Sequence, residues 1–156
     1  MQREIRLLRL LPDMNETSPG GLSSQRSADS LRGIRCQISH WSLDNHPPYF
    51  ALSYTWGSPT PNYAIYLDGA ELGVTNNLKD ALFQFREIFK RPNPKRPQFW
   101  WIDAICINQS DDQERSWQVQ QMQEIYRGAE SVMIWLGVAA NSSEQALHRL
   151  EIIGRR

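Results

Sequence analysis

The sequence lacks the features that mark several protein classes. It has no net charge, with 17 basic and 17 acidic residues among 156, whereas general nucleic-acid binding needs a basic surface. No apolar run approaches the roughly 20 residues of a membrane span. The run "IRLLRLL" near the N-terminus is interrupted by Arg6 and Arg9 and is too short for a signal peptide. We therefore expect neither nucleic-acid binding nor a membrane span.

Cysteine and histidine are also scarce. The two cysteines, Cys36 and Cys106, are too few for a disulfide framework and favour a reducing compartment, the cytoplasm. Cys106 lies between two isoleucines, so we expect a small buried apolar side chain rather than a nucleophile. Cys36, His40 and His46 offer only three ligands at a spacing that does not suit zinc. We therefore expect no metal site and no bound cofactor.

The length suits a single domain, residues 1–156. Residues 12–33 are rich in proline, glycine and serine and predict a flexible loop between two strands at 3–11 and 34–41. Further strands are expected at 49–54, 99–105 and 131–137, with a hairpin at Asp68-Gly69. Helices are expected near 77–90, 111–127 and 141–153, with caps at Asn76 or Asn77, at Ser110, and at Ser142 or Ser143.

This alternation of strands and helices predicts an α/β fold. Crossover connections favour a mainly parallel, flavodoxin-like sheet flanked by helices, in which the strands at 49–54, 99–104 and 131–136 are buried. The N-terminal strand pair and the hairpin are expected as antiparallel additions.

Polar chemistry follows two of these strands. "SYTWG" (53–57) and "DAICINQ" (103–109) would project toward one rim if their strands are parallel neighbours. In open α/β sheets, ligands bind beyond such carboxyl ends. A candidate ligand site is therefore expected there. Its residues are Ser53, Tyr54, Trp56, Gly57, Asp103 and Gln109.

Each of these residues also has a purely structural interpretation. Tyr54 and Trp56 would stack on a flat ring or simply pack at the edge of the core. Asp103 would hold a ligand hydroxyl or accept hydrogen bonds from loop amides. Gln109 would bind a ligand or satisfy the loop. Ser53 lacks a nearby histidine, so a serine-hydrolase triad is not expected.

The helix after this loop is rich in glutamine and carries Glu114 near its start. Glu114 lies beside the apolar stripe of the helix, and Gln118 and Gln121 share its side. A half-buried glutamate among amides suits a face that grips a polar ligand. An acid in the first turn is also favoured by the helix dipole alone, without any ligand.

Three separated motif blocks resemble the fungal heterokaryon incompatibility (HET) domain. They are "YFALSYTWG" (49–57), "FWWIDAICINQSDDQERSWQVQQMQEIYRG" (99–128, with the block taken as 99–127) and "SVMIWLG" (131–137). The opening "IRLLRLLP" and the "VTNNL" before the first helix are similar too. The resemblance covers residues 3 to about 137, and only the stretch 12–33 departs from it as an insertion.

This resemblance implies a role in fungal non-self recognition and innate immunity that triggers programmed cell death. HET domains are also similar to Toll/interleukin-receptor (TIR) domains, several of which cleave NAD at the nicotinamide–ribose bond with a glutamate. The resemblance thus implies NAD or a related nucleotide as substrate, a homo-oligomer on activation, and a regulatory protein partner of unknown identity.

Bond cleavage at the ribose builds positive charge there, which a carboxylate stabilises. We expect Glu114 to be this catalytic carboxylate and Gln118 to join the ligand-binding residues. Two other functions remain open: a TIR-like signalling module that self-associates without chemistry, and a sensor that binds NAD-like nucleotides without turnover.

Overall fold

The computed structural model describes residues 3–12, 33–58, 60–89, 93 and 96–138. Most of the loop expected at 12–33 and the helix expected at 141–153 lie outside these residues. The strands are β1 (Glu4–Leu10), β2 (Arg35–Ser42), β3 (Tyr49–Tyr54), β4 (Tyr63–Leu67), β5 (Ala70–Val74), β6 (Phe99–Trp101) and β7 (Ser131–Trp135). The helices are α1 (Asn76–Ile88), α2 (Asp103–Cys106) and α3 (Asp112–Gly128).

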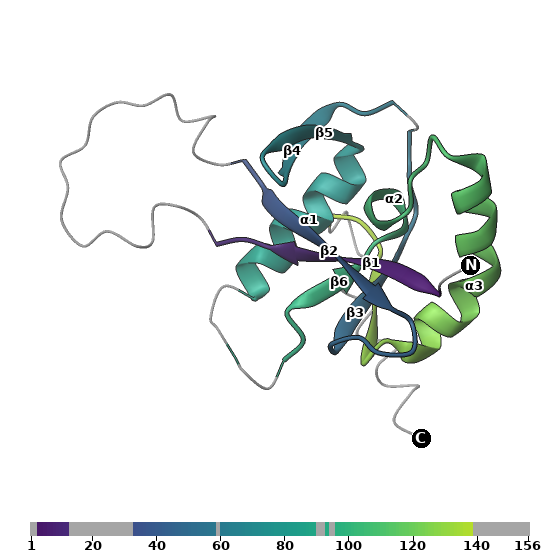
Figure 1. The fold of residues 1–156 in the computed structure, drawn as a ribbon. Helices are drawn as coiled ribbons and strands as arrows, with labels where there is room; N and C mark the ends of the chain where they lie inside the picture. Colours follow the sequence, from purple (N-terminus) through teal and green to yellow (C-terminus); the bar gives the residue numbers. More distant parts are fainter. Residues whose placement is uncertain (1–2, 13–32, 59, 90–92, 94–95, 139–156) are drawn as a thin grey trace, which may run out of the picture.

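The strands form one mixed sheet in the order β5-β4-β2-β1-β6-β3-β7 (Figure 1). The pairs β2–β4, β3–β6 and β3–β7 are parallel, and β1–β2, β1–β6 and β4–β5 are antiparallel. The expected α/β class is confirmed, but the mainly parallel, flavodoxin-like sheet is wrong. The cause is β1, which lies between β2 and β6 and is antiparallel to both, so the N-terminal pair is central rather than peripheral.

Helices α1 and α3 cover opposite faces of the sheet. Phe50 and Trp100 are register partners on one face, where Phe85 of α1 stacks on Trp100 with ring centroids 4.5 Å apart. Trp101, the next residue of β6, points to the other face and packs edge-on against Tyr126 of α3. Within the described residues, no helix is long and apolar enough to cross a membrane.

Both helix starts differ by a residue or more from the expected caps. Helix α1 is capped by Thr75, whose hydroxyl accepts from the Leu78 N–H, rather than by Asn76 or Asn77. Helix α3 is capped by Asp111, which accepts from two backbone N–H groups, rather than by Ser110. Threonine and aspartate are both favourable N-cap residues. The sequence therefore offered more than one candidate cap at the start of each helix.

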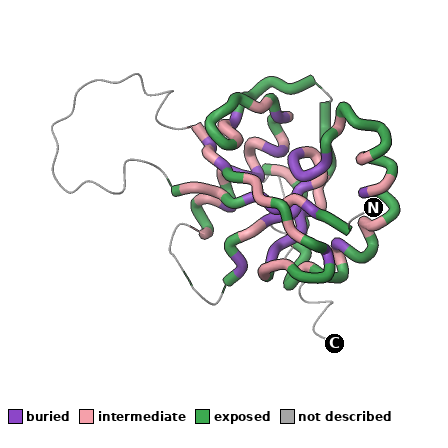
Figure 2. Tube along the Cα trace, viewed as in Figure 1, coloured by how far each residue is buried: buried purple, intermediate pink, exposed green. Residues whose placement is uncertain are grey.

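The last two expected strands also need correction. Strand β6 ends at Trp101, and Asp103 opens the short helix α2 instead of closing a strand. Strand β7 is one of the two edge strands and is largely exposed, not buried as expected, whereas β3 is mostly buried. In Figure 2 the buried residues gather in the centre of the molecule, and exposed residues line the outer loops and α3. An apolar run of this length does not distinguish a central strand from an edge strand.

Candidate functional site

The ends of β3 and β6 form a shared polar rim, as the sequence predicts, because these strands are parallel neighbours. The Trp56 indole N–H, in the loop after β3, donates to Asp103 Oδ2 at 2.9 Å. The Gln109 side-chain amide donates to the Asp103 backbone carbonyl at 2.9 Å. Three candidate residues from two motif blocks are therefore brought into direct contact.

Asp103 is a half-buried carboxylate held by neutral donors. Its Oδ1 accepts from the Ala104 backbone N–H at 2.7 Å, and its Oδ2 accepts from Trp56. Burial raises the pKa of Asp103, and the hydrogen bonds from Trp56 and Ala104 offset part of that rise. Burial also raises the pKa of Tyr54, with a further contribution from the negative charge of Asp103. Asp103 and Tyr54 therefore share one poorly solvated environment.

Asn77, which the sequence suggested only as a helix cap, ties this rim together. Its side-chain amide donates to the Thr55 carbonyl at 2.6 Å, and its Oδ1 accepts from the Trp135 indole N–H at 2.8 Å. Gly57 has a positive φ of 73° and lies close to Asn77, since a Cβ built at Gly57 would be 3.8 Å from the Asn77 Cβ. Asn77 thus joins the loop after β3 to the last residue of β7 at the start of α1.

Ser53 and Gln118 do not join the Trp56–Asp103 contact. Ser53 precedes Tyr54 on β3, so its side chain points to the opposite face of the sheet. Gln118 is buried on α3, and its amide donates to the Glu4 carbonyl of β1 at 2.8 Å. The Gln118 Oε1 atom is buried without a hydrogen-bond partner in the described structure.

Glu114 lies in the first turn of α3, where it forms an ion pair with Arg6 of β1. Its Oε1 also accepts from the Asn108 backbone N–H at 2.9 Å. The Arg6 Nε donates in turn to the Cys106 carbonyl at 2.8 Å. Nothing in the sequence around Arg6 pointed to this role, because its partner lies 108 residues away.

One short loop connects Glu114 to the rim. The Ile107 N–H donates to the Asp103 carbonyl at 3.1 Å, and the next N–H, that of Asn108, donates to Glu114. Glu114 and Asp103 therefore hold successive residues of the same segment without touching each other. The expected burial of Cys106, which precedes this loop, is confirmed, and desolvation raises its pKa to about 12.

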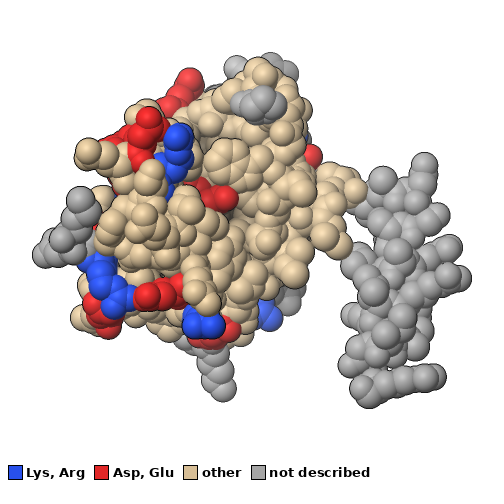
Figure 3. Space-filling model, turned by 90° about the vertical axis from the view of Figure 1, so that its right-hand side faces the viewer, with Lys and Arg blue, Asp and Glu red and all other residues tan. Residues whose placement is uncertain are grey.

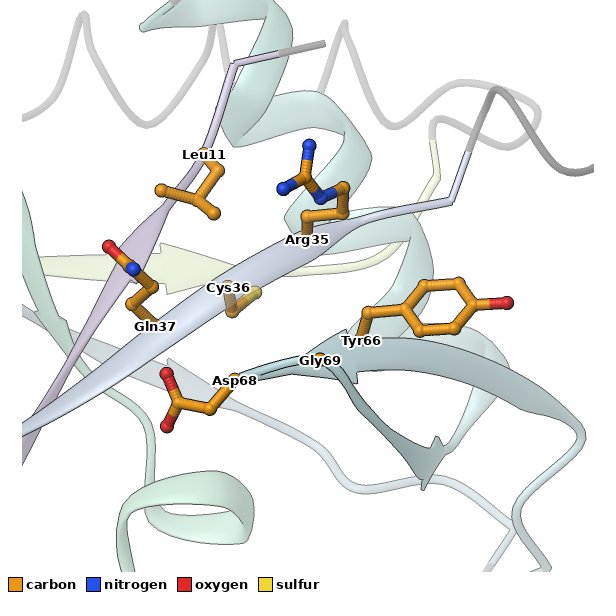
Figure 4. A pocket seen from close by; sticks show the side chains of 7 residues that line it. All are labelled: Leu11, Arg35, Cys36, Gln37, Tyr66, Asp68 and Gly69. Carbon is orange, nitrogen blue, oxygen red and sulfur yellow. The ribbon is translucent and has the colours of Figure 1, made fainter. Parts of the chain in front are cut away.

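A measurable pocket lies elsewhere, beside the paired ends of β2 and β4, with a volume of about 290 Å³ (Figure 4). None of the predicted site residues lines it, and in the close-up Arg35, Tyr66 and Asp68 point in different directions. On the face seen in Figure 3, acidic and basic side chains lie next to one another rather than forming a single basic patch.

Comparisons with known proteins agree with the motif blocks. The family "Heterokaryon incompatibility protein (HET)" matches residues 49–154. Heterokaryon incompatibility protein 6, OR allele, of Neurospora crassa is 38% identical over 130 residues, which are 78% of this chain and 19% of that protein. The chain thus spans about a fifth of this relative's length. No solved structure matches the chain. The extent of the family match, over all three motif blocks, places this chain in the HET family.

Proposed function

We propose that this domain is an effector of fungal non-self recognition that triggers programmed cell death by cleaving NAD at the nicotinamide–ribose bond in the cytoplasm. Membership of the HET family and the similarity to a heterokaryon incompatibility protein support the biological role. The cleavage step is supported by the contacts that hold one carboxylate in place, that of Glu114.

The carboxylate of Glu114 is fixed through one oxygen. Both Arg6 and the Asn108 N–H donate hydrogen bonds to Oε1, and within the described residues no hydrogen bond to Oε2 is found. An ionised group held in this way needs no rearrangement to stabilise a cation that develops beside it. Nicotinamide is already a cationic leaving group in NAD, so one carboxylate suffices without a general acid.

The rim offers matching groups for the rest of the nucleotide. Trp56 is 44% exposed as a residue although its indole N–H donates to Asp103, and in this proposal a nicotinamide or adenine ring stacks on its indole. The Asp103 carboxylate accepts hydrogen bonds and would take one from a ribose hydroxyl. In this proposal Tyr54, Gly57 and Gln109 shape the rim around the ligand.

The contacts of Glu114 also fit a second function. A glutamate that pairs with Arg6 and caps a loop can be a structural brace, as in a TIR-like module that self-associates without chemistry or a sensor that only binds NAD-like nucleotides. Both alternatives predict NAD left intact, so the product of incubation separates them from the enzyme.

The test is incubation of the purified domain with NAD, followed by chromatography for free nicotinamide. We expect nicotinamide release that rises more steeply than protein concentration, since TIR-like enzymes complete their pocket on assembly. The second product distinguishes hydrolysis, which gives ADP-ribose, from cyclisation, which gives cyclic ADP-ribose. Intact NAD at every concentration over a hundredfold range would rule out the enzymatic proposal and leave the two alternatives.

A further inference from the structure

Helix α3 presents two different surfaces to the sheet. In its C-terminal part, 122–128, the residues that are not exposed are Met122, Ile125 and Tyr126. In its N-terminal part, 112–121, they are Glu114, Trp117, Gln118 and Gln121. At 3.6 residues per turn, all of these lie on one side of the helix. The side that faces the sheet is therefore apolar in the C-terminal part and largely polar in the N-terminal part.

The C-terminal part is attached to the sheet by apolar packing and by two hydroxyl groups. Ile125 is fully buried, and the Tyr126 ring packs edge-on against Trp101. The Tyr126 hydroxyl donates to the Leu52 carbonyl at 3.0 Å, and the Tyr49 hydroxyl donates to the Ile125 carbonyl. Detaching this part would expose apolar surface and break both hydrogen bonds, so it is firmly held.

The N-terminal part buries polar atoms that have no partner. The Gln118 amide donates to the Glu4 carbonyl, but its Oε1 atom accepts no hydrogen bond in the described structure. The Oε1 atom of Gln121 and the indole N–H of Trp101, on the sheet beneath α3, are also buried and unpaired there. A buried polar atom without a partner is penalised, because water would satisfy it. Packing of this part against the sheet is therefore weakly favoured.

We propose that the N-terminal part of α3 opens from the sheet within the folded protein while the C-terminal part stays packed, and that the Arg6–Glu114 ion pair holds it closed. Opening lets water reach the unpaired glutamine oxygens, and it exposes little apolar surface. Local opening of this kind occurs where buried apolar contacts are few. The ion pair is half-buried and joins β1 to the first turn of α3. It is therefore placed to set how often the helix opens.

Opening would act directly on the candidate site. Glu114 would leave both Arg6 and the Asn108 N–H, so the loop between α2 and α3 would lose its anchor. The closed state thus holds the Glu114 carboxylate in place and the open state releases it. This inference does not depend on NAD cleavage, and its test uses no nucleotide.

Hydrogen exchange followed by NMR at single-residue resolution tests the proposal on the whole chain. The amides of 116–120 and 124–128 lie at equal distances from the two ends of the hydrogen-bonded helix, so end fraying affects both sets alike. After correction for intrinsic rates, we expect 116–120 to exchange at least about tenfold faster than 124–128. The Asp111 side-chain cap alone favours the opposite order. Equal protection of the two sets would show a rigid helix and overturn the inference.

A pair of glutamine substitutions tests the cause. Gln121→Met replaces the partly buried glutamine by an apolar side chain of similar length and helix propensity, whereas Gln120→Met makes the same change at an exposed position. We expect Gln121→Met to slow exchange at 116–120 by about tenfold and Gln120→Met to leave it unchanged. No slowing in Gln121→Met, or equal slowing in both variants, contradicts the proposal.

The role of the ion pair is tested in the same experiment. Arg6→Ala should speed exchange at 116–120 by about tenfold or more, because it removes the partner of Glu114. Arg3→Ala removes the exposed partner of Glu124 and should leave these amides unchanged. The same exchange rates in both variants would show that Arg6 does not hold the helix closed.

Discussion

The two ends of α3 carry similar ion pairs in different surroundings. Glu114 pairs with Arg6 near the start of the helix, and Glu124 pairs with Arg3 ten residues later. The side chains of Glu114 and Arg6 are 28% and 22% exposed, against 58% and 44% for Glu124 and Arg3. The same chemical pair is thus half-buried at one end of the helix and on the surface at the other.

The two pairs also differ in what else they hold. Arg6 binds the Cys106 carbonyl, and Glu114 accepts from Asn108, so the inner pair fixes the loop between α2 and α3. The second partner of Arg3 is the exposed Asp44. Exposed pairs typically contribute little to stability. The comparison therefore indicates that Glu114 is positioned by its environment, whereas Glu124 merely has a neighbour of opposite charge.

The largest difference in stability should follow removal of the arginines. Arg6→Ala removes the ion-pair partner of the half-buried Glu114 carboxylate and the donor to the Cys106 carbonyl, and should cost about 2 kcal/mol in the free energy of unfolding. Arg3→Ala should cost at most about 0.5 kcal/mol. Urea denaturation of both variants measures the two values. Equal losses would mean that the inner pair has no special role.

A smaller difference is expected in the coupling between partners. A double-mutant cycle on Arg6 and Glu114 should give about 1 kcal/mol, and the cycle on Arg3 and Glu124 about 0.3 kcal/mol. Repeating both cycles at about 1 M salt should remove the outer coupling and retain most of the inner one, since salt screens exposed charges far more strongly. If salt reduced both coupling energies to the same extent, the Arg6–Glu114 pair would not be better shielded from solvent than the Arg3–Glu124 pair.

The smallest expected effect concerns Asp103, a carboxylate held by the neutral donors Trp56 and Ala104. Its pKa is raised in the folded protein, so the folded state binds the proton more tightly than the unfolded state does. Ionised Asp103 therefore lowers stability above its folded pKa, and this penalty disappears as pH falls toward the unfolded value near 3.9.

Asp103→Asn removes that titration. The difference in unfolding free energy, variant minus wild type, should be largest near neutral pH and should decrease as the pH is lowered toward 4, as followed by urea denaturation at a series of pH values. A difference that grows on acidification would show that Asp103 has a lowered pKa instead.

Local patterns predicted the elements and the rim well. The helix expected near 77–90 is observed as α1, and Leu78, Leu82 and Phe85, which recur at helical spacing, are all buried. The meeting of "SYTWG" with "DAICINQ" followed from the parallel pairing of β3 with β6, which is observed, and Trp56 does contact Asp103. These features depend on short sequence windows and on the fact that the carboxyl ends of neighbouring parallel strands lie at the same edge of a sheet.

Long-range features could not be predicted from the same signals. The insertion of β1 between β2 and β6 depends on pairing between residues such as Leu8 and Trp100, far apart in the sequence. The Arg6–Glu114 pair has the same origin, and it changes the meaning of Glu114 from a first-turn acid to an anchored carboxylate. The exposure of β7 likewise depends on strand order, which an apolar run does not encode.

The most direct test of the central claim compares Glu114→Gln with Glu124→Gln in the NAD assay, under conditions where the wild type releases nicotinamide. Both changes neutralise one glutamate of α3 that faces an arginine, and both variants should melt within a few degrees of the wild type. We expect Glu114→Gln to lower the rate of nicotinamide release by about a hundred- to a thousandfold, and Glu124→Gln to leave it unchanged. A folded Glu114→Gln protein that releases nicotinamide at the wild-type rate would contradict catalysis through Glu114.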